Sequence, residues 1–260
     1  MINKYKQLFT LLSITGIYSI PDILLNVFNI NVFYGTTHTS IYVEFWNNMY
    51  TYIKSFSLTL VTGFVSLLFS LILGVGFGFI IGYKNFGVAE SVFKFIWSLP
   101  LIAVSNYLFI FLSVSSFWFA VITGVFLGVF PILSFTFRKC TERDDKILNM
   151  VASFNLTKWQ EFKYFRWQEI WDSHNINTVL AQSVPLTYVG VTMGEYLVGN
   201  PIMSNYNGLG TLFHKAMTDV RYDRVYITMF LMMTLVYFTG LIAEEFPRLR
   251  DYFKSKFFNI

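Results

Sequence analysis

The chain has 260 residues, of which 55% are hydrophobic, 20% are aromatic and only 13% are charged. A soluble domain usually carries about 25% charged residues because its surface faces water, so the composition excludes an ordinary soluble protein. The net charge of +4 is weak evidence for a nucleic-acid partner, and we expect none. Because Cys140 is the single cysteine, an internal disulfide is excluded, and one thiol with three scattered histidines predicts no metal site.

Six apolar stretches predict an all-α, polytopic membrane bundle with about six transmembrane helices. In chain order they are Leu8–Ile20, Phe56–Ile81, Phe95–Leu112, Phe117–Phe137, Asn177–Val198 and Val225–Ile242. The first stretch follows Lys4 and Lys6 as a signal peptide would, but no small-residue cleavage site comes after it, so we expect a retained anchor.

The distribution of Lys and Arg predicts the orientation, since cytoplasmic loops carry the excess of positive charge. With both termini in the cytoplasm, only four of the 19 Lys and Arg residues fall outside, namely Lys54, Lys215, Arg221 and Arg224. A single transmembrane domain 1–260 then consists of an N-terminal span and outer loop (1–50), spans two to four (51–137), a cytoplasmic loop (138–172), spans five and six (173–245) and a cytoplasmic tail (246–260).

Small residues recur every four positions along the second stretch and lie on one face of a helix. They are Thr62, Ser66, Ser70, Gly74, Gly78 and Gly82. Lipid tails are as apolar as Leu, so helices in a membrane associate where small side chains let their backbones approach closely. We therefore expect Gly74, Gly78 and Gly82 to pack against a neighbouring helix.

The fifth stretch separates two faces by chemistry. One carries Tyr188, Thr192 and Glu195 at helical spacing, and the other carries small residues that include Gly190 and Gly194. An ionisable residue within a span is costly and marks a bundle interior, a water-filled route or an interface. Two interpretations stay open: Tyr188, Thr192 and Glu195 line a translocation pathway, or Glu195 is an interfacial carboxylate near the outer end of the span.

The charged loop between the fourth and fifth stretches predicts a helix, a tight turn and a second helix. Asn155 stands where the first helix ends, and Asn is the best substitute for Gly in a left-handed stop. Thr157 and Gln160 then form a capping box that starts a new helix. An aromatic face at Trp159, Phe162 and Phe165 either folds back on the protein's own spans or is offered to a partner.

This loop resembles the EAA loop in permease subunits of binding-protein-dependent ABC importers. The positions that fit the pattern are Asp144, Thr157, Lys158, Trp159, Phe162 and Lys163. Further along, Gly190, Glu195, Gly199 and the run Gly208, Leu209, Gly210 resemble the nitrate, sulfonate, taurine and bicarbonate branch. The loop is degenerate, with Asn149 for the family's Glu, Met150 and Val151 for two Ala, Asn155 for Gly, and Gln168 and Asp172 for prolines.

The resemblance implies a type I ABC importer permease fold in the inner membrane, a permease homodimer, ABC ATPase subunits and a solute-binding protein as partners. It implies that Asn155, Thr157, Lys158, Trp159, Phe162 and Lys163 couple the bundle to the ATPase. No phosphate-binding loop sequence occurs in the chain, so we expect no catalytic residue and no cofactor, with ATP held by the partner. The expected cargo is a small solute, either an anion of that branch or a vitamin precursor.

Three other classes remain as alternatives. An ion-coupled secondary transporter normally needs buried ionisable groups near mid-span, and Glu195 is the one convincing intramembrane acid. A membrane-embedded enzyme would show paired acids or clustered histidines, whereas His38, His174 and His214 are far apart in the sequence. A structural subunit of a larger membrane complex would differ in that no ATPase activity responds to substrate.

Overall fold

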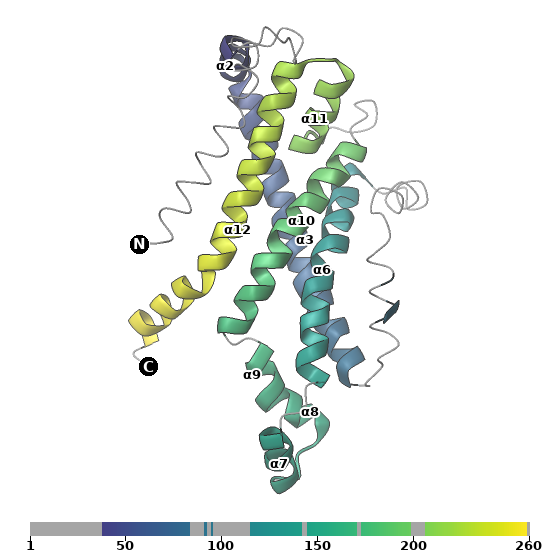
Figure 1. The fold of residues 1–260 in the computed structure, drawn as a ribbon, viewed down its shortest axis with the longest axis vertical. Helices are drawn as coiled ribbons and strands as arrows, with labels where there is room; N and C mark the ends of the chain where they lie inside the picture. Colours follow the sequence, from purple (N-terminus) through teal and green to yellow (C-terminus); the bar gives the residue numbers. More distant parts are fainter. Residues whose placement is uncertain are drawn as a thin grey trace, which may run out of the picture.

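The computed structural model describes residues 38–83, 91, 92, 95, 115–141, 145–170, 173–198 and 206–258, and these residues form helices and turns without any strand (Figure 1). The helices are α2 (His38–Asn47), α3 (Met49–Tyr83), α6 (Ser116–Thr141), α7 (Asp145–Ser153), α8 (Lys158–Glu161), α9 (Trp167–Ile170), α10 (Ser173–Leu197), α11 (Leu209–Thr218) and α12 (Tyr222–Phe258). A π-helical turn, Phe162–Arg166, joins α8 to α9.

Three of the described helices are long and apolar enough to cross a membrane: Met49–Gly82 within α3, Ser116–Thr141 in α6 and Tyr222–Glu245 within α12. The predicted second, fourth and sixth spans fall on these helices, which identify a membrane-embedded protein. The predicted first span, Leu8–Ile20, lies outside the described residues, as does the third, Phe95–Leu112, except for Phe95.

The predicted fifth span coincides with α10, which is not among those three helices. The polar residues of α10 make it less apolar than these helices, and three of them, Ser183, Thr187 and Glu195, are fully buried. By contrast, α3 exposes large apolar side chains on its outer surface, including Phe64 and Ile72. Polar groups inside and apolar groups outside are the arrangement that a lipid environment requires.

Helices α3 and α6 are packed through the small-residue stripe. Gly74, Gly78 and Gly82 of α3 are buried against Ile132, Thr136 and Cys140 of α6, in that order. A Cβ placed on Gly78 would lie 2.9 Å from the Leu133 carbonyl oxygen and 2.7 Å from the Cβ atom of Thr136. The two backbones therefore approach closely along this seam, with space for hydrogen atoms only at the glycine positions.

Helix α10 packs against α6 beside α3 by the same means. A Cβ on Gly190 would lie 2.6 Å from the Thr123 carbonyl oxygen, and one on Gly124 would lie 2.5 Å from the Val191 side chain. Helix α12 also packs against α10, where Tyr188 and Leu235 belong to one buried apolar cluster. Within the described part of the chain, the long helices α3, α6, α10 and α12 form a bundle (Figure 1).

The two ends of this bundle differ in construction. Helices α7, α8 and α9 extend beyond one end, which we call the α7 end, while α2 and α11 lie at the opposite end, which we call the α11 end (Figure 1). Helix α3 contributes a segment of 34 residues, about 51 Å long at 1.5 Å per residue. Since the hydrocarbon core of a bilayer is about 30 Å thick, both ends can reach the polar region of the membrane.

Candidate functional site

The segment that carries the predicted coupling residues is a helix, a turn and a second helix at the α7 end. Helix α7 ends in a left-handed residue, Asn155, whose φ is 49°. The Leu156 N–H donates to the Val151 carbonyl at 3.0 Å, and the Asn155 N–H donates to the Ala152 carbonyl at 3.2 Å. This pair of bonds is the Schellman stop, which favours Gly and, after Gly, Asn at the left-handed position.

The second helix begins with the capping box that the sequence predicts. The Thr157 backbone N–H donates to the Gln160 side-chain oxygen at 2.9 Å, and the Gln160 N–H donates to the Thr157 hydroxyl at 3.4 Å. These bonds satisfy two amides that a helix N-terminus leaves without partners. The bend between α7 and α8 is therefore held by local hydrogen bonds.

Apolar side chains remain exposed around this bend. Phe154 is 72% exposed, Trp159 is 60% exposed, and Met150 is also exposed. The Trp159 ring additionally makes an edge contact with Phe79 of α3, with the ring centroids 5.9 Å apart. Trp159 thus touches the bundle on one side and leaves most of its surface open.

The remaining predicted coupling residues follow on the same segment. Lys163 is exposed, and its ammonium group lies 5.7 Å from the ring centroid of Tyr164. Lys158 and Phe162 open α8 and the π-helical turn, and their side chains lie outside the described part of the structure. The turn leads into α9, whose Ile170 is fully buried and fixes the segment to the bundle.

A second cluster surrounds Glu195, at the α11 end of α10. Its side chain is fully buried, with 0% of its surface exposed. Three groups donate to its carboxyl oxygens: the Thr59 hydroxyl at 2.9 Å, the Tyr206 hydroxyl at 2.5 Å and the Gly210 backbone N–H at 2.9 Å. Burying such a group is costly unless partners satisfy it, and these partners come from α3, α11 and the segment before α11.

Tyr206 extends this cluster toward α3. Its hydroxyl lies 2.7 Å from the Thr62 hydroxyl, which in turn donates to the Leu58 carbonyl at 2.8 Å. Burial raises the pKa of Tyr206, and the neighbouring Glu195 raises it further. The Tyr206 hydroxyl therefore keeps its proton and remains a donor.

The other two predicted pathway residues lie on the same side of α10 as Glu195. Tyr188 is buried, donates to the Leu60 carbonyl of α3 at 3.2 Å and touches Gly63, which has no room for a Cβ. The Thr192 hydroxyl is bonded to carbonyls of its own helix, including that of Val189 at 3.0 Å. In this structure Tyr188 and Glu195 face α3 and are packed against it.

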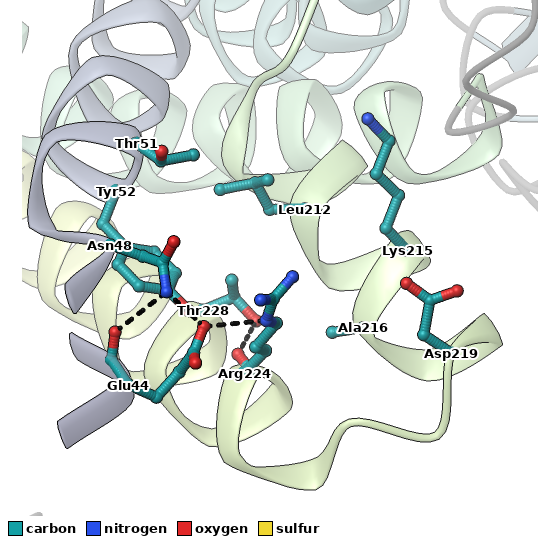
Figure 2. A pocket seen from close by; sticks show the side chains of 10 residues that line it. All are labelled: Glu44, Asn48, Thr51, Tyr52, Leu212, Lys215, Ala216, Asp219, Arg224 and Thr228. Atoms are coloured by element: carbon teal, nitrogen blue, oxygen red, sulfur yellow. Dashed lines mark hydrogen bonds and ion pairs between the residues drawn. The ribbon is translucent and has the colours of Figure 1, made fainter. Parts of the chain in front are cut away.

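A third polar site, which the sequence did not point to, is a small cavity of about 80 Å³ where α2, α3, α11 and α12 meet (Figure 2). Arg221 donates to Glu44 at 3.2 Å and also binds Asp223. Arg224 forms an ion pair with Glu44 at 2.8 Å, although its Nε–H does not point along a hydrogen bond. Glu44 thus links α2 to the start of α12. In the sequence, the one sign of this site is that Glu44 and the two arginines, which have opposite charges, lie close to apolar stretches.

Among the described residues, no group of histidine, cysteine, aspartate and glutamate side chains could hold a metal ion. Compared with protein-family models, with curated proteins and with solved structures, the chain has no significant match.

Proposed function

We propose that the chain is the permease subunit of an ATP-binding cassette importer and that the α7–α8 segment docks into a separate ATPase subunit. The observation that carries the proposal is the combination of a hydrogen-bonded bend with exposed Phe154 and Trp159 beyond one end of a membrane bundle. Large exposed aromatic side chains on a fixed scaffold are typical of binding surfaces, where such residues supply most of the free energy.

The contact between Trp159 and Phe79 supports a role in coupling as well as in docking. A partner bound to the exposed part of Trp159 would contact α3 indirectly, through Phe79. Helix α3 is in turn packed against α6 at the glycine seam. Movement of the ATPase would then reach the long helices without passing through a flexible loop. Lys163, exposed beside this surface, would supply a charged rim.

The finer features of the proposal follow from the sequence. They are six spans in the inner membrane with both termini in the cytoplasm, a permease homodimer, and a solute-binding protein that delivers its cargo at the α11 end. The chain would hold no cofactor and carry no catalytic residue, since its partner would bind and hydrolyse ATP. The resemblance favours a small solute, either an anion such as nitrate, sulfonate, taurine or bicarbonate, or a vitamin precursor.

The experiment that tests this function is reconstitution of the chain with an ATPase subunit. The full chain is co-expressed with an ATP-binding cassette ATPase encoded beside it, purified through a tag on the chain and placed in lipid nanodiscs. We expect a stable complex whose ATP hydrolysis responds to the neighbouring solute-binding protein. A chain that recovers no such ATPase, or a complex whose hydrolysis ignores the binding protein, would contradict the proposal.

The Glu195 cluster favours one other function, an ion-coupled secondary transporter, because a fully buried carboxyl that is hydrogen-bonded to a tyrosine is a group that can carry a proton. The two functions differ in what drives uptake into cells or vesicles. Uptake by an importer requires ATP and persists when an uncoupler removes the proton gradient. Uptake by a proton-coupled transporter is abolished by the uncoupler and continues without ATP.

A further inference from the structure

Helix α11 begins without a capping side chain of its own. Its N-cap residue is Gly208, which makes no side-chain hydrogen bond. The first amides of a helix lack partners within the helix, and a buried helix start needs them from elsewhere. At α11 these partners come from two other helices of the bundle.

Two side chains satisfy the first amides of α11. The Leu209 N–H donates to the Thr59 hydroxyl at 2.9 Å, and the Gly210 N–H donates to the Glu195 carboxyl at 2.9 Å. The Thr59 hydroxyl in turn donates a hydrogen bond to the same carboxyl at 2.9 Å. A negative carboxylate at a helix N-terminus is also favoured by the helix dipole.

The surrounding backbone is shaped to admit the carboxyl group. Gly208 lies directly against the Glu195 carboxyl and has no room for a Cβ. At Gly210 a Cβ would lie 2.6 Å from the Glu195 Cβ and 2.8 Å from the Tyr196 backbone nitrogen. Tyr206 closes the remaining side and connects to Thr62 of α3. The carboxyl therefore joins α3, α10 and α11 at one point.

We infer that Glu195 is a positioning residue that holds α11 and Tyr206 against α3 and α10, so that the α11 end of the bundle stays closed and moves as one body. The inference rests on the proposed function only in treating this end as the outer mouth of the permease. In that setting Glu195 does not bind the solute, and it fixes the surface beside which the solute is delivered.

Two substitutions show whether Glu195 positions α11 through its hydrogen bonds or only by filling space. Glu195→Met keeps a side chain of similar length and removes every acceptor. Glu195→Gln keeps one oxygen for the Gly210 N–H and for Thr59, while its amide N–H donates to the Tyr206 hydroxyl. Tyr206 can then donate to Thr62, whose hydroxyl already donates to the Leu58 carbonyl. Gln is therefore expected to preserve the junction, and Met is expected to break it.

The test is cysteine labelling of the purified full chain in detergent, in a Cys140→Ser background that removes the only native thiol. Leu209→Cys reports on the buried start of α11, Met217→Cys on its exposed part and Val191→Cys on the seam between α10 and α6. We expect Glu195→Met to raise the maleimide labelling rate at position 209 by about tenfold or more. The rates at positions 191 and 217 should stay the same, and Glu195→Gln should remain within about threefold of the parent at position 209.

An unchanged rate at position 209 in Glu195→Met would overturn the inference, and so would an equal rise at positions 209 and 191, which would mean general loosening. If Glu195→Met does not fold, Thr59→Val is tested with the same reporters and the same expected and contrary outcomes. The labelling requires neither an ATPase nor a transported solute. Its failure would leave the importer proposal intact, and failure of ATPase binding would leave this inference intact.

Discussion

The two ends of the bundle differ in how far their key side chains are buried and in how far along the sequence their hydrogen bonds reach. At the α11 end the Glu195 carboxyl is fully buried, and its donors come from positions as far away in the sequence as Thr59. At the α7 end the hydrogen bonds of the bend join residues within five positions of one another, and Trp159 and Phe154 remain exposed. At the α11 end the buried carboxyl is satisfied by distant parts of the chain, whereas at the α7 end the backbone is satisfied locally and apolar side chains remain exposed.

This difference fits the proposed function, in which the α7 end docks into an ATPase and the α11 end is held together by the chain's own contacts. Long-range hydrogen bonds at the α11 end fix helices to one another, whereas short-range bonds at the α7 end fix the shape of a protrusion and leave its surface uncovered. The glycine seam packs the part of α3 that is nearer the α7 end against α6. Substitutions at the seam, at the left-handed turn and at the capping box each remove one of these features.

The largest effect is expected at the seam. Gly78→Leu places a side chain against the Leu133 carbonyl and the Thr136 side chain, and should lower the free energy of unfolding by about 3 kcal/mol. Gly76→Leu is the matched control, since a Cβ there has nothing within 4 Å. The measurement is unfolding of each variant in mixed micelles. Equal loss of stability in both variants would show that the seam does not depend on close approach.

A smaller effect is expected at the left-handed turn. Asn155→Val forces a β-branched residue into a positive φ and should cost about 1–2 kcal/mol of local stability. Asn155→Gly should cost nothing measurable, because Gly adopts this conformation freely. Hydrogen exchange of α7 and α8 measures the difference, and identical exchange in the two variants would mean that the turn is not required for the shape of the segment.

The smallest effect is expected at the capping box. Thr157→Val removes the hydroxyl that accepts the Gln160 N–H and should destabilise α8 by about 1 kcal/mol. The change is local, so the exchange of α11 amides should stay constant while exchange in α8 rises about fivefold. If exchange rises at both ends, the two ends are not independent in the way that their hydrogen bonds indicate.

The sequence was most informative where a feature depends on neighbouring positions. The capping box at Thr157, the stop at Asn155 and the four-residue spacing of Gly74, Gly78 and Gly82 are local patterns, and the structure contains each of them at the predicted place. Their physical causes, which are unpaired amides, positive φ and close helix approach, act over one or two turns of helix.

The partners of Glu195 and Glu44 could not be predicted in the same way. Thr59 is separated from Glu195 by 136 positions, and Arg221 is separated from Glu44 by 177. The hydrogen-bond partner of a threonine in an apolar stretch cannot be read from the sequence, because most such hydroxyls bond to their own helix, as Thr62 does with Leu58. Which helices meet is decided by the fold, and one sequence does not contain that information in a local pattern.

The most direct test of the account is the affinity of the ATPase for the full chain in nanodiscs, compared between Trp159→Ala and Trp46→Ala. The two tryptophans are similarly exposed, at 60% and 66%, but Trp46 lies on α2 at the opposite end. Loss of a central aromatic anchor costs about 2 kcal/mol or more, so the dissociation constant should rise about thirtyfold for Trp159→Ala and stay at the wild-type value for Trp46→Ala. Equal affinity in both variants would contradict docking at the α7 end.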